Sequence, residues 1–151
     1  MIPFLILLHL LGLAFGLGGM VCQLLLLGRF HHSPDPQERI GSERMAAAAI
    51  MAVQAPGVYL SILTGIALTW AFQWRMLSQG WLQFKLLFVF WILLATRLMA
   101  RNAENIRLLR EQCGDEDTER LKSLKLNHRM IGYVTVLTFL FVITLSLWKP
   151  F

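Results

Sequence analysis

The stretch Ile2–Leu27, with the sequence IPFLILLHLLGLAFGLGGMVCQLLLL, decides the fold of this chain. It exceeds the roughly 20 apolar residues that a helix needs to cross a bilayer. His9 is its only readily ionisable side chain, and such a group at membrane depth is costly enough to be a functional-site candidate by default. Successive helix positions turn by about 100°, and the residues that consequently share the face of His9 are Gly12, Gly16, Gly19 and Gln23.

This face of histidine and glycine fits two interpretations. A nitrogen ligand beside a surface with almost no side chains suits a flat bound group. Small residues also let two membrane helices approach closely. The face therefore predicts either a cofactor site or a close helix contact, and the first segment alone leaves both open.

Three further apolar segments follow in the chain of 151 residues, of which 56% are hydrophobic. Each is long enough to cross a bilayer as a helix. We expect an all-α integral membrane protein, a four-helix antiparallel bundle that forms a single transmembrane domain over residues 1–151. The helices are expected at about residues 2–28, 37–72, 80–112 and 118–148.

The basic residues predict the orientation of this bundle. Most of them lie in or beside the first and third connections, whereas the second connection and the chain ends carry few. Cytoplasmic loops are enriched in Lys and Arg, so both termini are expected on the outer, periplasmic side. Because the charges lie between apolar segments, the net charge of +5 indicates a protein that contacts membrane lipid and not nucleic acid. Tryptophans favour membrane interfaces, and those expected at the outer helix ends are Trp70, Trp74, Trp81 and Trp148.

Two helices are expected to begin outside the membrane. Asp35-Pro36-Gln37-Glu38 has the pattern of an N-cap, a proline at the first helical position and an acid at the third. The second helix is therefore expected to begin near Pro36. Asp117 or Thr118 is expected to cap the last helix, which then also starts in water.

The other three segments also carry small or polar residues along one face. These are Gln54, Gly57, Ser61, Thr64 and Gly65 on the second segment, and His128, Gly132, Thr135, Thr138 and Ser146 on the fourth. On the third segment Lys85 shares its side with Trp81, Phe88, Ile92 and Thr96. Small and hydroxyl residues usually join membrane helices through close packing and modest hydrogen bonds. The four faces together predict a partly polar bundle interior.

His9 and Lys85 add chemistry that packing alone does not require. Both are expected in the outer half of the bundle, at comparable depth. Neutral imidazole is a common ligand of haem iron, and a hydrogen-bonded packing role is the alternative for His9. Lys85 has three interpretations: it extends to the interface, it binds an anionic group such as a propionate, or its neutral amine binds a metal.

The other histidines are expected at the cytoplasmic border. His31 and His32 are interpreted as solvated loop residues, because no carboxylate or cysteine accompanies them at a metal-ligand spacing. His128 is expected to pair with anionic lipid, together with Arg129, and a second, inner-side metal ligand is the alternative. The sequence has no phosphate-cradling glycine loop, dinucleotide fingerprint or nucleophile elbow, which argues against soluble nucleotide cofactors.

The order of these motifs resembles that of the small HemJ-type protoporphyrinogen oxidases and, more broadly, of copper-resistance-D-like membrane proteins. The features that carry the resemblance are Leu8-His9-Leu10-Leu11-Gly12 with Gly19, Pro56 with Gly65, Gly80-Trp81-Leu82-Gln83-Phe84-Lys85, Asn127, and Trp148-Lys149-Pro150-Phe151. The resemblance spans nearly the whole chain. The chain departs from the family where Asn-Glu-x-Pro reads Asn127-His128-Arg129-Met130, and where the first helix lacks Pro-Arg at its end.

The resemblance implies haem b bound within the bundle of a protein of the bacterial-type inner membrane. It implies His9 as a ligand of the haem iron, with Lys85 or His128 as further metal-binding candidates, and Lys85, Gly12, Gly16 and Gly19 as cofactor-binding residues. It also implies oxidation of protoporphyrinogen IX to protoporphyrin IX in haem biosynthesis, with electrons passed to a membrane electron acceptor. Because several polar residues of the family are replaced, haem binding is the stronger expectation, and no catalytic residue is assigned. The alternatives are a non-catalytic four-helix protein that binds haem or copper, or a structural partner subunit; a homo-oligomer is compatible with each.

Overall fold

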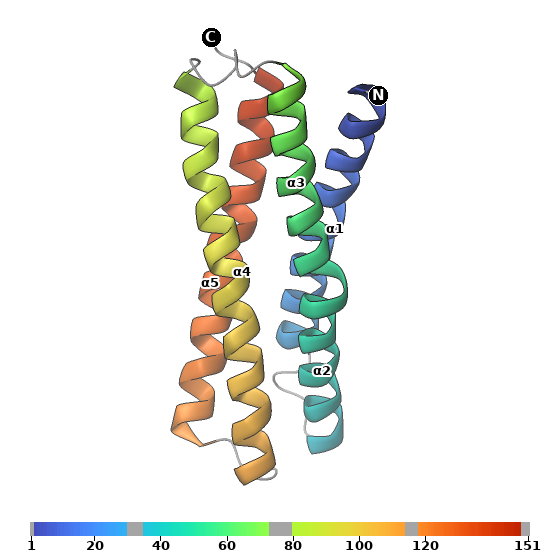
Figure 1. The fold of residues 1–151 in the computed structure, drawn as a ribbon. Coiled ribbons are helices and arrows are strands. Elements are labelled where there is room, and N and C mark those ends of the chain that lie inside the picture. Colours follow the sequence, from blue (N-terminus) through green and yellow to red (C-terminus); the bar gives the residue numbers. More distant parts are fainter. Residues whose placement is uncertain (1, 30–34, 73–79, 114–117, 149–151) are drawn as a thin grey trace.

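The computed structural model describes residues 2–29, 35–72, 80–113 and 118–148, which form four long helical rods (Figure 1). The elements are α1 (Ile2–Arg29), α2 (Pro36–Ala49), the π-helix η1 (Ile50–Gln54), α3 (Ala55–Ala71), α4 (Gly80–Cys113) and α5 (Glu119–Trp148). α2, η1 and α3 follow one another without a break and make a single rod. The rods begin and end within one residue of the expected ranges.

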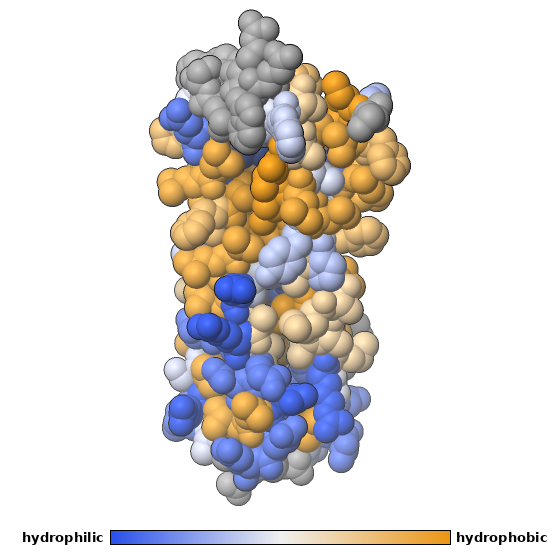
Figure 2. Space-filling view, viewed as in Figure 1, coloured by the Kyte–Doolittle hydropathy of each residue, from blue (hydrophilic) through white to orange (hydrophobic). Residues whose placement is uncertain are grey.

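All four rods are long and apolar enough to cross a membrane. The described residues are helical apart from the positions that flank the helices. The expected all-α protein with four membrane-spanning helices is therefore confirmed. Figure 2 shows an apolar zone over one half of the rods and a hydrophilic end where α2 begins and α4 ends. The rods thus continue beyond the apolar zone at that end.

The start of α2 follows the predicted capping pattern. Asp35 has extended backbone, and its side chain accepts a hydrogen bond of 2.9 Å from the amide of Gln37. Pro36 opens the helix, where its missing N–H costs nothing. At the start of α5 the carbonyl of Thr118 accepts a 3.0 Å bond from the amide of Lys122, so Thr118 occupies the N-cap position. Asp117 lies outside the described residues.

α1 and α3 run in opposite directions and touch along a seam of glycines. A Cβ atom on Gly12 would lie 2.6 Å from the amide nitrogen of Ser61, and one on Gly19 would lie 2.8 Å from that of Gln54. A Cβ atom on Gly57 would lie 2.5 Å from the amide nitrogen of Gly16. No side chain fits between these backbones. The face of His9 and its glycines is thus a close helix contact, the second of the two interpretations left open by the sequence.

The second pair of helices, α4 and α5, is joined by aromatic and aliphatic contacts. The rings of Phe88 and Phe141 meet edge to face, with centroids 5.1 Å apart and planes at 72°. A cluster of buried apolar side chains from all four rods fills the middle of the bundle: Met20, Val58, Ile92, Met99 and Phe139. Two groups of polar side chains also lie between the rods, and the second of them contacts the core residue Met99 through Gln23.

Candidate functional site

The first polar group, here called the outer cluster, consists of His9, Ser61, Thr64, Lys85 and Ser146. The ring nitrogen Nδ1 of His9 lies 2.8 Å from the backbone carbonyl oxygen of Ser61 and 3.1 Å from Oγ1 of Thr64. A carbonyl oxygen only accepts hydrogen bonds, so the proton of a neutral His9 ring resides on Nδ1. The hydroxyl of Thr64 donates its hydrogen to the carbonyl of Leu60 at 2.7 Å, so its oxygen can accept a hydrogen bond from Nδ1 of His9. The lone pair of His9 is therefore on Nε2.

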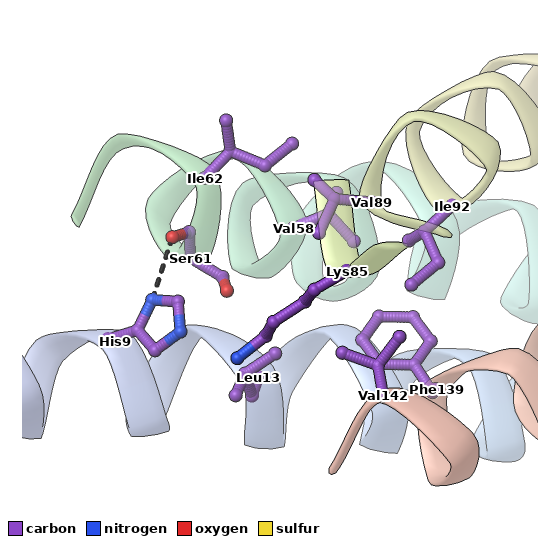
Figure 3. A pocket seen from close by; sticks show the side chains of 10 residues that line it. All are labelled: His9, Leu13, Val58, Ser61, Ile62, Lys85, Val89, Ile92, Phe139 and Val142. Atoms are coloured by element: carbon purple, nitrogen blue, oxygen red, sulfur yellow. Dashed lines mark hydrogen bonds between the residues drawn. The ribbon is translucent and has the colours of Figure 1, made fainter. Parts of the chain in front are cut away.

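The Nε2 atom of His9 faces an apolar cleft that Lys85 shares (Figure 3). Lys85 donates a 2.6 Å hydrogen bond from Nζ to Oγ of Ser146. The cleft has a volume of about 40 Å³, well below the range of about 300–1,000 Å³ usual for ligand sites, so a large ligand would have to displace the side chains that line it. The rest of its lining is apolar except for Ser61, and comprises Leu13, Val58, Ile62, Val89, Ile92, Phe139 and Val142.

The structure sorts the predicted cofactor-binding residues into two places. His9 and Lys85, which lie 76 positions apart in the chain, meet at the cleft. Gly12, Gly16 and Gly19 do not line it, because α3 and η1 cover them. A flat group bound against these glycines would have to displace α3 and η1, so any ligand of His9 would have to approach Nε2 from the cleft.

The second polar group, here called the inner chain, links all four rods. It consists of Gln23 on α1, Gln54 in η1, Thr96 on α4 and His128 on α5. His128 Nε2 lies 3.2 Å from Oε1 of Gln23, the amide nitrogen of Gln23 donates to Oε1 of Gln54 at 2.7 Å, and that of Gln54 donates to Oγ1 of Thr96 at 3.3 Å. All donors therefore point the same way along the chain, from His128 to Thr96. Thr96 is 3% exposed and none of the others exceeds 1%.

Gln54 enters this chain from the last position of the π-helix η1. In η1 the amide of Ala55 bonds to the carbonyl of Ile50, five residues back instead of four. The extra residue in the turn changes the phase of α2 relative to α3, whereas Gln54 keeps the face of Gly57 against α1. Single π-helical turns often occur at functional sites. The sequence places Gln54 on the polar face of its helix, but contains no signal for the changed turn.

His128 is fully buried, so the expectation that it pairs with anionic lipid is wrong. Its Nδ1 atom is buried, and within the described part of the chain it has no hydrogen-bond partner; the same holds for the amide nitrogen of Asn102. The contact of Met99 with Gly132 sets a register that places Asn102 on α4 level with His128 on α5. At the His128 end of the inner chain, the acceptor Nδ1 of His128 and the donor amide of Asn102 therefore lie at the same level along the bundle.

His9 and His128 belong to different sites. His128 binds Gln23, which lies fourteen residues after His9 on α1, so the two histidines are about 21 Å apart along the helix axis. A single haem iron cannot bind both side chains. The geometry therefore contradicts the prediction that His128 is a second ligand of the iron bound by His9.

A buried ion cluster lies beyond the inner chain, towards the hydrophilic end. The carboxylate of Glu43 on α2 receives Arg110 of α4 at 2.9 Å and Lys125 of α5 at 2.6 Å, with all three side chains no more than 11% exposed. Sequence reasoning missed this cluster, because its members are 67 and 82 positions apart and charges on helix extensions are usually solvated. It fixes the three helices to one another where they leave the apolar zone.

Several predicted positions contribute no structural observation. His31, His32 and Trp74 lie outside the described residues, as do the side chains of Trp81 and Trp148. Trp70 is described and is 71% exposed, as an interfacial residue would be.

In the described ranges no three His, Cys, Asp or Glu side chains gather as a metal site.

Comparison with known proteins agrees with a membrane role. Residues 3–150 match the model of a family described as predicted integral membrane protein (DUF2269). The chain belongs to this family. No curated protein and no solved structure matches it. The match covers all four rods of the DUF2269 protein, so the outer cluster and the inner chain both lie within the family's own extent, and the protein is a multi-pass integral membrane protein.

Proposed function

We propose that this DUF2269 protein binds haem b in its outer cleft, with Nε2 of His9 as a ligand of the iron. The observation that carries the proposal is the anchoring of Nδ1 on the carbonyl of Ser61, which leaves the lone pair of the ring directed at the cleft. Metal-binding histidines usually donate their second N–H to a carbonyl or carboxylate in this way, because the bond fixes the ring and its tautomer. The family resemblance through His9 and Lys85 supports the same ligand.

Lys85 is proposed to bind a carboxylate of the cofactor or of a porphyrin substrate. Its ammonium group has a hydroxyl partner in Ser146 and, in the described residues, no carboxylate partner. An uncompensated ammonium in an apolar cleft favours an anionic ligand. Haem supplies redox chemistry to such a site, while the protein supplies ligation, orientation and charge.

Oxidation of protoporphyrinogen IX, with electrons passed to a membrane acceptor, is the proposed activity of this site. It rests on the HemJ-type resemblance and on a cleft that joins an apolar wall to a cation, which matches an amphipathic macrocycle with carboxylates. The proposed insertion is antiparallel in an inner membrane with both chain ends outside, since the hydrophilic end carries most of the Lys and Arg residues. The outer cluster then lies in the outer half of the bilayer.

The absorption spectrum of the detergent-purified protein tests the haem proposal. We expect a Soret band that His9→Ala abolishes and that His128→Asn leaves at its original position and intensity. Thermal unfolding of both variants shows whether the helices remain folded. A Soret band that survives His9→Ala, or no band after reconstitution with haem, contradicts the proposal and leaves a structural partner subunit as the better reading. Rescue of a strain that lacks protoporphyrinogen oxidase tests the oxidase activity separately.

A further inference from the structure

A groove between α2 and α4 lies at the hydrophilic end of the bundle, far from the outer cleft. It has about 1,050 Å³ of space including its open side. Its floor is apolar and is formed by Ala47, Ala48, Met51, Ala103 and Ile106. Met51 belongs to η1 and is 68% exposed, so the floor continues onto the surface that faces the bilayer.

The rim of the groove carries charges of both signs. Arg44 and Arg107 supply two exposed cations, and Glu104 and Glu111 supply two exposed carboxylates. The buried ion pair of Glu43 and Arg110 also lines the groove. Arg107 lies 3.0 Å from Glu104 and 3.7 Å from Glu111, with more than half of each side chain exposed. Arg44 is also exposed, and the described residues include no carboxylate that pairs with it. The exposed rim is therefore neutral overall, with one positive charge on α2 and one net negative charge on α4, where Arg107 pairs with both carboxylates.

We propose that this groove binds a membrane phospholipid with a phosphoethanolamine headgroup. The phosphate would bind Arg44, and the primary ammonium would donate hydrogen bonds to Glu104 and Glu111. One acyl chain would lie on the floor of Ala47, Ala48 and Met51. The site is independent of haem binding.

Charge complementarity selects this headgroup over the other common ones. A purely anionic headgroup would place negative charge beside Glu104 and Glu111, which opposes the attraction of Arg44. A choline headgroup has the same formal charges but carries no N–H, so it cannot donate to the two carboxylates. Only a zwitterion with a primary ammonium satisfies both halves of the rim.

The position of the groove also favours a lipid as the occupant. The apolar run of α4 ends near Ala100, and α2 is charged before Met45, so the groove crosses the level at which the rods leave the apolar zone (Figure 2). Phospholipids present the same sequence of acyl chain and headgroup at this depth. Clefts between membrane helices at such a boundary are known places for headgroup recognition.

Native mass spectrometry of the delipidated protein in detergent tests the proposal with dioleoyl phosphatidylethanolamine, phosphatidylcholine and phosphatidylglycerol. We expect phosphatidylethanolamine to bind about tenfold more tightly than phosphatidylcholine, because each charge-assisted hydrogen bond is worth about 1.5 kcal/mol or more. Equal binding of these two lipids, or tighter binding of phosphatidylglycerol, overturns the proposal.

Two pairs of variants locate the site. Arg44→Ala is expected to weaken phosphatidylethanolamine binding about tenfold, whereas Arg101→Ala, an exposed arginine of α4 that does not line the groove, leaves it unchanged. Ala48→Trp fills the floor and is expected to abolish binding. Val53→Trp, which faces a different surface of η1, is its control. Equal effects of Arg44→Ala and Arg101→Ala, with unchanged thermal unfolding, would show that the lipid binds elsewhere.

Discussion

The outer cluster and the inner chain use similar residue types in opposite ways. In the outer cluster His9 anchors one ring nitrogen and turns the other to a cleft, and Lys85 contributes a cation to the same space. In the inner chain the side-chain amides of Gln23 and Gln54 bond to one another and to neighbours, and both residues are fully buried. The first arrangement leaves chemistry available to a ligand. The second uses its polar groups to hold four helices together.

This difference teaches that a buried histidine in a membrane bundle is not by itself a ligand. His9 and His128 both lie on the polar face of their helices, and both bond to a polar group of another helix. The two histidines differ in the surroundings of the ring nitrogen that makes no hydrogen bond. Nε2 of His9 faces a small cleft, whereas Nδ1 of His128 is buried and has no hydrogen-bond partner among the described residues. The proposal of His9 as a ligand therefore rests on the surroundings of its second nitrogen.

The largest effect is expected from Gln23→Leu. This substitution strands the N–H of His128 and the side-chain oxygen of Gln54 in the bundle interior, and each buried unsatisfied group costs about 1–3 kcal/mol. Unfolding in mixed micelles should show a loss of about 2–4 kcal/mol, with the Soret band unchanged in position. His9→Leu is the matched variant in the outer cluster, and should cost less stability. The reverse order would mean that the outer cluster, and not the inner chain, holds the bundle together.

A smaller loss is expected from Gly57→Ala, which tests the seam that connects the two polar groups. The added Cβ atom would lie 2.5 Å from the amide nitrogen of Gly16 and 2.9 Å from the carbonyl oxygen of Gly12. Overpacking of this kind costs about 1–3 kcal/mol. Gly18→Ala on α1 is the control, since its Cβ atom meets nothing within 4 Å, and it should be neutral or slightly stabilising. Equal losses in both variants would argue against a close α1–α3 contact.

The smallest effect is expected for the bond between Lys85 and Ser146. A double-mutant cycle with Lys85→Met and Ser146→Ala should give a coupling of about 0.6 kcal/mol, the average for side-chain hydrogen bonds in membranes. The same cycle with Gln23→Leu and His128→Leu in the inner chain should give a larger value, because both partners are fully buried. Comparable couplings in the two cycles would remove the distinction between a ligand-binding and a helix-joining cluster.

The sequence predicts the rods well because their signals are local. Apolar length, the Asp35 cap and the small residues on each helix face depend only on neighbours along the chain. The glycine seam also follows from spacing, since Gly12, Gly16 and Gly19 must lie on one face of a regular helix. Periodicity even places Gln23 on the face of His9, but it carries no information about which partner lies at each depth.

The parts that the sequence does not predict depend on distant partners or on a changed helical turn. His128 stands between Asn127 and Arg129, a context typical of an interface, and only the packing of α1 against α5 shows that it is buried. Glu43 meets Arg110 and Lys125 through two other helices. The π-turn leaves no local mark, because its residues Ile50–Gln54 suit an ordinary α-helix equally well.

That π-turn sets the phase of the whole second rod. One residue more in the turn rotates everything before Ile50 by about 100° relative to α3. Glu43 consequently meets Arg110 and Lys125 while Gly57 still meets Gly16. Removal of any single residue between Ile50 and Val53 would leave every side chain of α2 intact yet point Glu43 away from its two cations. The number of residues between Glu43 and Gln54 is thus a stricter constraint on this rod than the identity of most residues within it.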